Sequence, residues 1–112
     1  MRAETLKGHL DGLLLASLEH GPRHGYAIME ALRAGSGGQL DLPTGTIYPA
    51  LRRVERAGLV QGTWAEVGGR RRRIYHLTAA GHRTLAAERG AWRDFSVAVT
   101  ALLEPAPRPV AP

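Results

Sequence analysis

The sequence contains no cysteine and very few aromatic residues. Among its 112 residues are two Trp, three Tyr and one Phe, so aromatics make up only 5% of the chain. Without cysteine the protein can form no disulfide, no thiolate nucleophile and no zinc site with cysteine ligands. With so few aromatic side chains, leucine and alanine must supply most of the core packing.

Long apolar segments are absent as well. The longest, Leu13 to Leu18, is interrupted by Ser17 and is far shorter than the roughly 20 residues that cross a bilayer. The first residues, Met1 to Glu4, lack the apolar segment and small-residue cleavage site of a secretory signal. We therefore expect a cytoplasmic protein with no membrane partner.

Negative charge is scarce relative to positive charge. The chain has 10 acidic residues against 15 lysines and arginines, which gives a formal net charge of +5. With 44% hydrophobic and 22% charged residues, its composition is that of one globular domain and not of a disordered or fibrous protein. An excess of positive charge favours a polyanionic partner, and nucleic acid is the first one to consider.

Apolar residues at helical spacing predict three helices in the first half of the chain. The first covers about Thr5 to Glu19 and is followed by the stop signal Gly21-Pro22. The second begins just after Gly25 and ends at Gly35. The third ends at Gly58 and has one buried face, formed by Ile47, Ala50, Leu51 and Val54.

Pro49 lies close to the start of the third helix. With Thr46 as the N-cap, Pro49 is the third helical residue and removes no intrahelical hydrogen bond, whereas a start at Thr44 costs one bond. Both starts are compatible with a helix.

Two strands and one long helix are predicted after the third helix. The strands cover Leu59 to Val67 and Arg73 to Leu77, and Gly68-Gly69 between them favours a tight turn. Thr78 is the candidate N-cap of a helix that runs to Leu103. The apolar positions of this helix are spaced close to a heptad, at Leu85, Trp92, Phe95 or Ser96, Val99 and Leu102.

Two groups of arginines predict a surface for nucleic acid. A short helix, a glycine-containing turn and a helix with Arg52 and Arg56 opposite its apolar face form a helix-turn-helix arrangement, whose second helix enters the major groove. The hairpin adds Arg70 to Arg73, consecutive cations whose repulsion a polyanion would relieve, as in a DNA-binding wing. The alternative is that the helical arginines form only a solvated face.

Four segments resemble motifs of PadR-type transcriptional regulators. They are GPRHGY at 21–26, TGTIYPAL at 44–51, ERAGLV at 55–60 and RIYHLTAAG at 73–81, and their order and spacing are far more specific than any one of them. The resemblance covers about residues 5–103. The short chain with a single C-terminal helix is most similar to the small subfamily of these regulators. It implies a winged helix-turn-helix homodimer that binds a palindromic operator, usually as a repressor.

The resemblance and the basic residues together select candidate DNA contacts. These are Tyr26, Thr44, Gly45, Thr46, Tyr48, Arg52, Arg56, Gly69, Arg70, Arg71 and Arg72. Tyr48 has an alternative role, in which its ring packs against the hairpin. Tyr75 and Leu77 are expected in the core, and the arginine run is denser than the family pattern requires.

The apolar seam of the last helix predicts a homodimer, because a domain this small has nothing else to bury it. The candidate interface residues are Leu6, Leu10, Leu13, Leu85, Trp92, Phe95, Val99 and Leu102. The alternative is a last helix folded back on its own core.

In one multidrug-sensing branch of the family a tryptophan stacks on a flat aromatic ligand at the dimer centre, which makes Trp92 and Phe95 candidate ligand contacts. The alternative places Trp92 in the interface core.

The predicted fold is mainly α with a small β-hairpin. It consists of a winged helix-turn-helix domain at 1–77, a dimerisation helix at 78–104 and a disordered proline-rich tail at 105–112.

No phosphate-binding loop or paired carboxylates indicate an enzyme, and no cofactor is expected. His20 and His24 have metal-ligand spacing, but Gly21-Pro22 breaks the helix that this spacing needs, so no metal site is predicted. The alternative function is a winged-helix module for protein contact.

Overall fold

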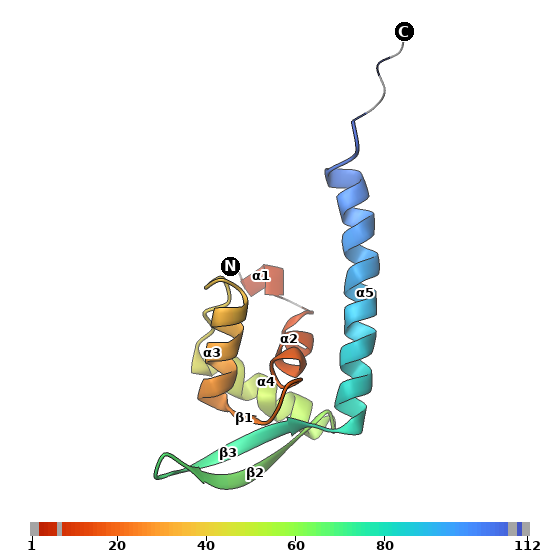
Figure 1. Ribbon diagram of the computed structural model, residues 1–112. Coiled ribbons are helices and arrows are strands. Elements are labelled where there is room, and N and C mark those ends of the chain that lie inside the picture. The colour runs from red at the N-terminus through yellow and green to blue at the C-terminus, as the bar shows by residue number, and fades with distance from the viewer. Residues whose placement is uncertain (1–2, 7, 108–109, 111–112) are drawn as a thin grey trace.

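The computed structural model describes residues 3–6, 8–107 and 110 (Figure 1). Along the chain these residues form α1 (Ala3–Leu6), α2 (Leu10–Ser17), β1 (Arg23–His24), α3 (Gly25–Gly35), α4 (Thr44–Arg56), β2 (Val60–Val67), β3 (Arg70–Leu77) and α5 (Ala79–Leu103). Figure 1 shows α2, α3 and α4 gathered on one side of the β2–β3 hairpin, while α5 extends away from them. None of the helices described is long and apolar enough to cross a bilayer.

Helices α2, α3 and α4 pack around a single apolar core. The buried face predicted for the third helix is confirmed, because Ile47, Ala50, Leu51 and Val54 of α4 are all almost completely buried. They meet Leu14 and Leu15 of α2 and Ile28 of α3 in the same cluster. Tyr75 and Leu77 of β3 are buried too, as the sequence predicts.

The first predicted helix is wrong in its extent, because two shorter helices replace it. Gly8 has a φ of 84°, a left-handed conformation that a continuous right-handed helix cannot contain. Helix α2 therefore starts afresh at Leu10, and it ends at Ser17, two residues earlier than the predicted Glu19. Lys7, within the predicted helix, lies outside the described residues, as do residues 108–109 and 111–112 of the predicted disordered tail.

The sheet has three antiparallel strands in the order β1-β3-β2. Sequence analysis missed β1, which has only two residues and therefore shows no periodicity. It also placed the start of the second hairpin strand at Arg73, whereas β3 begins at Arg70, paired with Val67 directly across the turn. This start was missed because a run of arginines has no strand-like pattern, yet the ladder continues to the turn. Gly68 and Gly69 form that turn, with φ of 59° and 77°.

Helix α4 begins at Thr44, with Pro43 as its N-cap, which is the earlier of the two predicted starts. Pro49 therefore lies inside the helix and lacks the N–H that would donate to the carbonyl of Gly45. At the other end, Gly58 has a φ of 76°. The N–H groups of Gly58 and Leu59 donate to the carbonyls of Glu55 and Val54, both at 3.0 Å, and so form a Schellman motif.

Only Thr78 separates β3 from α5. Its hydroxyl accepts a hydrogen bond from the N–H of Gly81 at 3.1 Å, which confirms the predicted N-cap, and donates to the carbonyl of Gly58 at 2.6 Å. A Cβ on Gly81 would lie 2.0 Å from the carbonyl oxygen of Leu59, so glycine is needed for this close approach. The base of the hairpin and the start of α5 are therefore held together directly.

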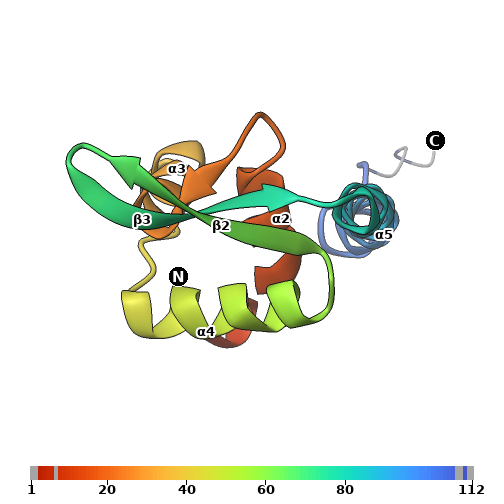
Figure 2. The ribbon, with the colours of Figure 1, turned by 90° about the horizontal axis from the view of Figure 1, so that it is seen from below.

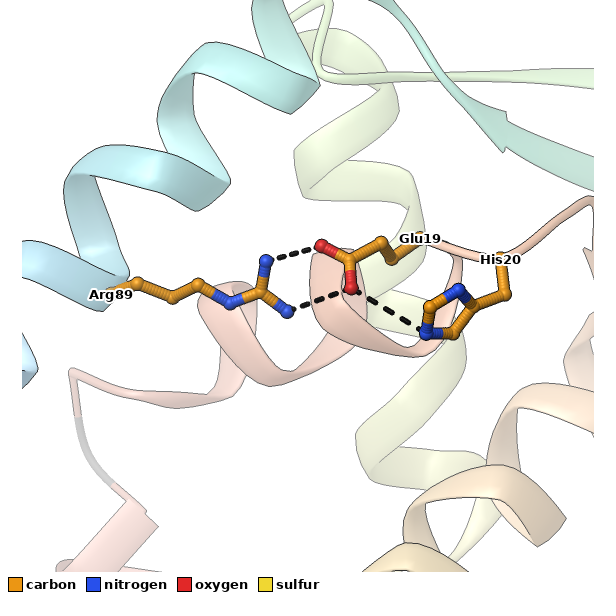
Figure 3. A network of polar contacts seen from close by, with 3 residues as sticks. All are labelled: Glu19, His20 and Arg89. Carbon is orange, nitrogen blue, oxygen red and sulfur yellow. Dashed lines mark hydrogen bonds and ion pairs between the residues drawn. The ribbon is translucent and has the colours of Figure 1, made fainter.

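An ion pair also links the end of α2 to α5 (Figure 3). The two terminal guanidinium nitrogens of Arg89, Nη1 and Nη2, donate to the carboxylate of Glu19, and His20 Nε2 lies 3.5 Å from Glu19 Oε1. The hydrogen bonds from Arg89 hold the pKa of Glu19 below its usual value. Because the pair is exposed, it adds little stability, and its structural effect is to orient α5 against α2.

Candidate nucleic-acid interface

Helix α4 presents its basic residues on the face turned away from the core. Arg52, Arg53 and Arg56 are all exposed on this face. Arg53 forms an ion pair with Asp11 of α2, whose carboxylate accepts two hydrogen bonds from it. Within the described part of the chain, Arg52 and Arg56 have no acidic partner. These two guanidinium groups are therefore available to an external anion.

The first turn of α4 is open to close approach. Thr44 and Gly45 are exposed, and Thr46 is half-buried. No atom lies within 4 Å of the position that a Cβ on Gly45 would take. In a helix-turn-helix the N-terminal residues of the second helix contact base edges, so this turn has the small size and hydroxyl groups that such contact needs.

Tyr48 packs toward α3. A Cβ on Gly25 would lie 2.5 Å from the hydroxyl oxygen of Tyr48, so only glycine leaves room for the ring. The ring is half-buried and belongs to the residues packed against the core. The observed contact is thus with α3, whereas the predicted packing role placed the ring against the hairpin. DNA contact by Tyr48 stays a prediction.

His24 caps the N-terminus of α3. Its Nδ1 accepts a hydrogen bond from the N–H of Ala27 at 3.3 Å, which requires that nitrogen to be unprotonated. Burial and then the nearby charge of Arg72 lower the pKa of His24, so the neutral ring is favoured. The residues that the structure describes contain no group of three potential metal ligands around it or elsewhere.

The arginines of β3 point alternately to the two faces of the hairpin, because successive side chains of a strand do so. Arg71 and Arg73 lie on the face of Trp64, with their Cζ atoms 4.9 Å and 5.6 Å from the centre of an indole ring. The Cζ of Arg72 lies 5.5 Å from the ring of Tyr26, which is exposed at the start of α3. The alternation spaces out charges that are adjacent in the sequence.

Arg73 joins the hairpin to α4. Its Nη2 lies 2.7 Å from Oε2 of Glu55, and the same oxygen accepts the N–H of Gly62 at 3.1 Å. The hydrogen bond from Arg73 is the main cause that lowers the pKa of Glu55. Among the described residues, the arginines of α4 and β3 without an acidic partner are Arg52, Arg56, Arg70, Arg71 and Arg72. All of these are in the predicted set, which contains neither Arg53 nor Arg73.

The candidate interface residues differ in how much surface they retain within one chain. Leu6 and Leu85 are buried in the core of the domain, and Leu10, Leu13 and Val99 are half-buried. The outer part of α5 is different, because Trp92 and Phe95 are 54% and 56% exposed and Leu102 is 82% exposed. An isolated chain therefore leaves a row of large apolar side chains in water.

A groove of about 560 Å³ lies between α2 and α5 beside this row. Leu13, Leu85 and Trp92 contribute to its apolar lining. The ring of His9 meets Trp92 edge-on at 5.4 Å between ring centres, and the ring centre of Phe95 lies 6.0 Å from that of Trp92.

Comparison with known proteins identifies the family. Residues 14–87 match the family model described as the transcriptional regulator PadR-like family. The chain belongs to the PadR-like regulators. It is 34% identical over 74 residues to the transcriptional regulator Rv3488 of Mycobacterium tuberculosis, a match that covers 66% of this chain and 56% of that protein.

Two solved structures support the same assignment. A PadR family regulator from Eggerthella lenta is 33% identical, with a TM-score of 0.77 over 90% of this chain and 87% of the other. A PadR-like regulator from Bacillus cereus is 29% identical, with a TM-score of 0.80 over 91% of this chain and 98% of the other. The predicted fold class, a PadR-type winged helix-turn-helix with a long C-terminal helix, is thus confirmed. Membership in a family of transcriptional regulators implies DNA binding and agrees with the prediction that the protein is not an enzyme.

Proposed function

We propose that this PadR-like protein is a homodimeric repressor that binds a palindromic operator. The observation that carries the proposal is the distribution of unpaired charge. Among the described residues, Arg52 and Arg56 on the outer face of α4 and Arg70, Arg71 and Arg72 on the hairpin make up most of the arginines without an acidic partner, whereas Arg53 and Arg73 are neutralised by Asp11 and Glu55. The others in the described part of the chain without such a partner are Arg23, Arg83 and Arg93. The unpaired positive charge is thus concentrated where a winged helix-turn-helix meets DNA.

In this proposal α4 is the recognition helix and enters the major groove. Its open first turn, Thr44 to Thr46, approaches the base edges. Arg52 and Arg56 are one helical turn apart, so both guanidinium groups can reach the same strand and bind a phosphate or the edge of a guanine. Tyr26 and Tyr48 contact the backbone at the start of the groove.

The hairpin formed by β2 and β3 acts as the wing. Gly69 at the turn allows a close approach, and Arg70, Arg71 and Arg72 supply charge for the neighbouring phosphates and minor groove. Because these side chains alternate between the two faces, the wing carries positive charge on both sides.

The exposed apolar row on α5 supports dimerisation. Trp92, Phe95 and Leu102 would pack against the same residues of a second copy, while Leu10 and Leu13 support the partner helix. Two-fold symmetry then sets the recognition helices about 34 Å apart, one turn of DNA. A dimer seated on both half-sites blocks access to the promoter, which makes repression the expected output.

The proposal is tested by selecting binders from a pool of random duplexes and sequencing them. The affinity of the selected duplex and of a scrambled control is then measured at several salt concentrations, because specific and electrostatic binding respond differently. We expect an enriched palindrome with half-sites about one helical turn apart.

Arg52→Ala and Arg53→Ala form a matched pair for this test. We expect Arg52→Ala to weaken operator binding by about 1–3 kcal/mol, whereas Arg53→Ala, whose side chain is paired with Asp11, changes it little. If all duplexes bind alike and neither variant changes the binding, the winged helix serves protein contact instead. A reporter gene behind the selected operator distinguishes repression from activation.

The groove beside Trp92 supports a second candidate function, relief of repression by a flat aromatic ligand. Its apolar lining and the neighbouring rings of His9 and Phe95 suit such a molecule. In a Trp64→Phe protein Trp92 is the only tryptophan, so its fluorescence can be followed while flat cationic dyes are added. Quenching of the Trp92 fluorescence together with loss of operator affinity supports an effector site. If neither the fluorescence nor the operator affinity changes, Trp92 serves only the dimer interface.

A further inference from the structure

Trp64 is a large apolar residue in an unexpected position. It lies in the middle of β2 and is 57% exposed, although the chain contains only two tryptophans. It belongs to none of the four motif segments, and no candidate set from the sequence contains it. A tryptophan left in solvent on a narrow hairpin gains little for the fold, which raises the question of what covers it.

The indole lies near two guanidinium groups, of which, among the described residues, one is held by an acid and the other is not. Arg73 lies 5.6 Å from an indole ring and is held by Glu55 of α4. Arg71 lies 4.9 Å from the indole and has no acidic partner in the described part of the chain. The contacts from Glu55 through Arg73 and Trp64 therefore hold the free charge of Arg71 at a defined place relative to α4.

Trp64 also shares a cleft with the start of α4. A cavity of about 280 Å³ is lined by Trp64, Tyr48, Gly25 and the side chains of Arg71 to Arg73. Tyr48 contributes to this cleft from α4 and follows the open first turn of that helix by two residues, so the cleft lies between α4 and the wing, close to that turn. Any polyanion that met this turn would lie beside the indole.

The hairpin that carries Trp64 lies away from the apolar row on α5, which the proposed dimer would bury. Figures 1 and 2 both show the hairpin and its turn extending away from α5, which carries the apolar row. The charge around the indole also favours an anion. Among the described residues of β2 and β3, Glu66 is the only acid, and it lies opposite Arg71 in the strand register, while Glu55 of α4 is paired with Arg73.

We propose that Trp64 and Arg71 together form a contact to the sugar–phosphate backbone of duplex DNA, beside the groove that α4 enters. The exposed face of the indole packs on the deoxyribose, and the guanidinium of Arg71 binds the adjoining phosphate. The inference rests on the proposed DNA-binding function and adds to it a backbone contact that fixes the wing on the duplex.

The test uses the full chain labelled with 5-fluorotryptophan, so that Trp64 and Trp92 each give a ¹⁹F NMR signal. The Trp64→Phe protein assigns the two signals. The selected operator, or a random duplex at low salt, is added while the fluorescence anisotropy of the labelled DNA reports binding in the same samples. Solvent exposure of each indole is measured as the difference in its ¹⁹F shift between H₂O and D₂O.

We expect the Trp64 signal to move, and its solvent-dependent difference to shrink, in proportion to bound duplex. Unchanged Trp64 signals in a sample whose anisotropy shows saturated DNA would overturn the inference and leave the proposed function intact. Absence of any anisotropy change at low salt would overturn both. A larger response to single-stranded than to duplex DNA would indicate base stacking and so also contradict a backbone contact.

Substitutions provide an independent test. Trp64→Ala is expected to weaken duplex binding on the order of fivefold, because it removes the packing and frees Arg71, while Trp64→Phe retains most of the affinity. Thr63→Ala is the matched control, since Thr63 is exposed on the opposite face of the same strand. Glu66→Gln removes the acid beside the contact and should tighten binding. Equal affinities of Trp64→Ala and Thr63→Ala would contradict the inference.

Discussion

The hydroxyl oxygen of Tyr48 occupies the space where a side chain on Gly25 would begin, because a Cβ there would lie 2.5 Å from it. Gly25→Ala must therefore displace the ring of Tyr48. We expect this overpacking to lower the free energy of unfolding by about 1–2 kcal/mol, measured by urea denaturation. The glycine at the start of α3 thus sets how closely α4 packs against α3.

A double-mutant cycle separates this contact from the intrinsic preference of the helix. In a Tyr48→Ala background the ring is gone, and Gly25→Ala should then be neutral or stabilise α3 by up to about 1 kcal/mol, since alanine is the better helix former. The same loss of stability in both backgrounds would show that the ring is not the obstacle.

Gly81 and Gly90 provide a contrast within α5. A Cβ on Gly81 would meet the carbonyl oxygen of Leu59 at 2.0 Å, whereas nothing lies within 4 Å of one on Gly90. We expect Gly81→Ala to destabilise the protein by about 2–3 kcal/mol and Gly90→Ala to stabilise it by about 0.5–1 kcal/mol. Thermal unfolding followed by circular dichroism measures both. Similar effects of the two substitutions would refute the close approach of α5 to the hairpin base.

The cap formed by His24 predicts a pH dependence of stability. Because folding lowers the pKa of His24, the unfolded chain binds the proton more readily. The contribution of His24 is therefore complete above about pH 6.5, the ordinary value for histidine, and is lost as the pH falls below it. Unfolding measured at pH 7.5 and pH 5.5 should show the lower stability at pH 5.5.

His24→Asn tests the origin of this dependence. Asparagine caps a helix without titrating in this range, so the variant should lose less stability between pH 7.5 and pH 5.5 than the wild type. His20→Asn is the control, since the His20 side chain is 86% exposed and caps no helix. An identical pH dependence of His24→Asn and wild type would assign the effect to other groups.

Phe95 and Val97 lie on nearly opposite faces of α5, because two residues correspond to about 200° of rotation. Both are strongly exposed in a single chain, at 56% and 70%. In the proposed dimer Phe95→Asp places a charge in the interface and should weaken association by about 2 kcal/mol or more. Val97→Asp carries the same charge on the outer face and should remain dimeric. Analytical ultracentrifugation measures both, and dissociation of Val97→Asp alone would reverse the assignment of faces.

Periodicity predicted the helices well where one apolar face decides the structure. The buried face of α4 and the start and end of α5 follow from residue spacing and from local caps such as Thr78 and Gly58. It failed at Gly8, where the apolar repeat continues through a residue whose backbone leaves the helix. The spacing of apolar residues depends on side chains only. It cannot detect a helix break that is caused by the backbone conformation of a glycine.

The candidate surface was predictable in outline, but its charge pairing was not. Asp11 and Arg53 are 42 residues apart, and Glu55 and Arg73 are 18 apart, so only the tertiary structure brings each pair together. These pairs decide which arginines are free. Trp64 was missed for a related reason, because its exposure and its arginine neighbours result from the strand register.

A single residue, Thr78, connects β3 to α5. Because Thr78 is bonded to both Gly58 and Gly81, the wing and α5 have no flexible linker between them. In the proposed dimer, each base pair inserted between the half-sites would rotate one half-site by about 35° relative to the other. Without a flexible linker, the DNA-binding domain cannot rotate on α5 to match the new position. The protein should therefore bind operators with altered spacing more weakly. The distance between the half-sites then contributes to specificity along with their base sequence.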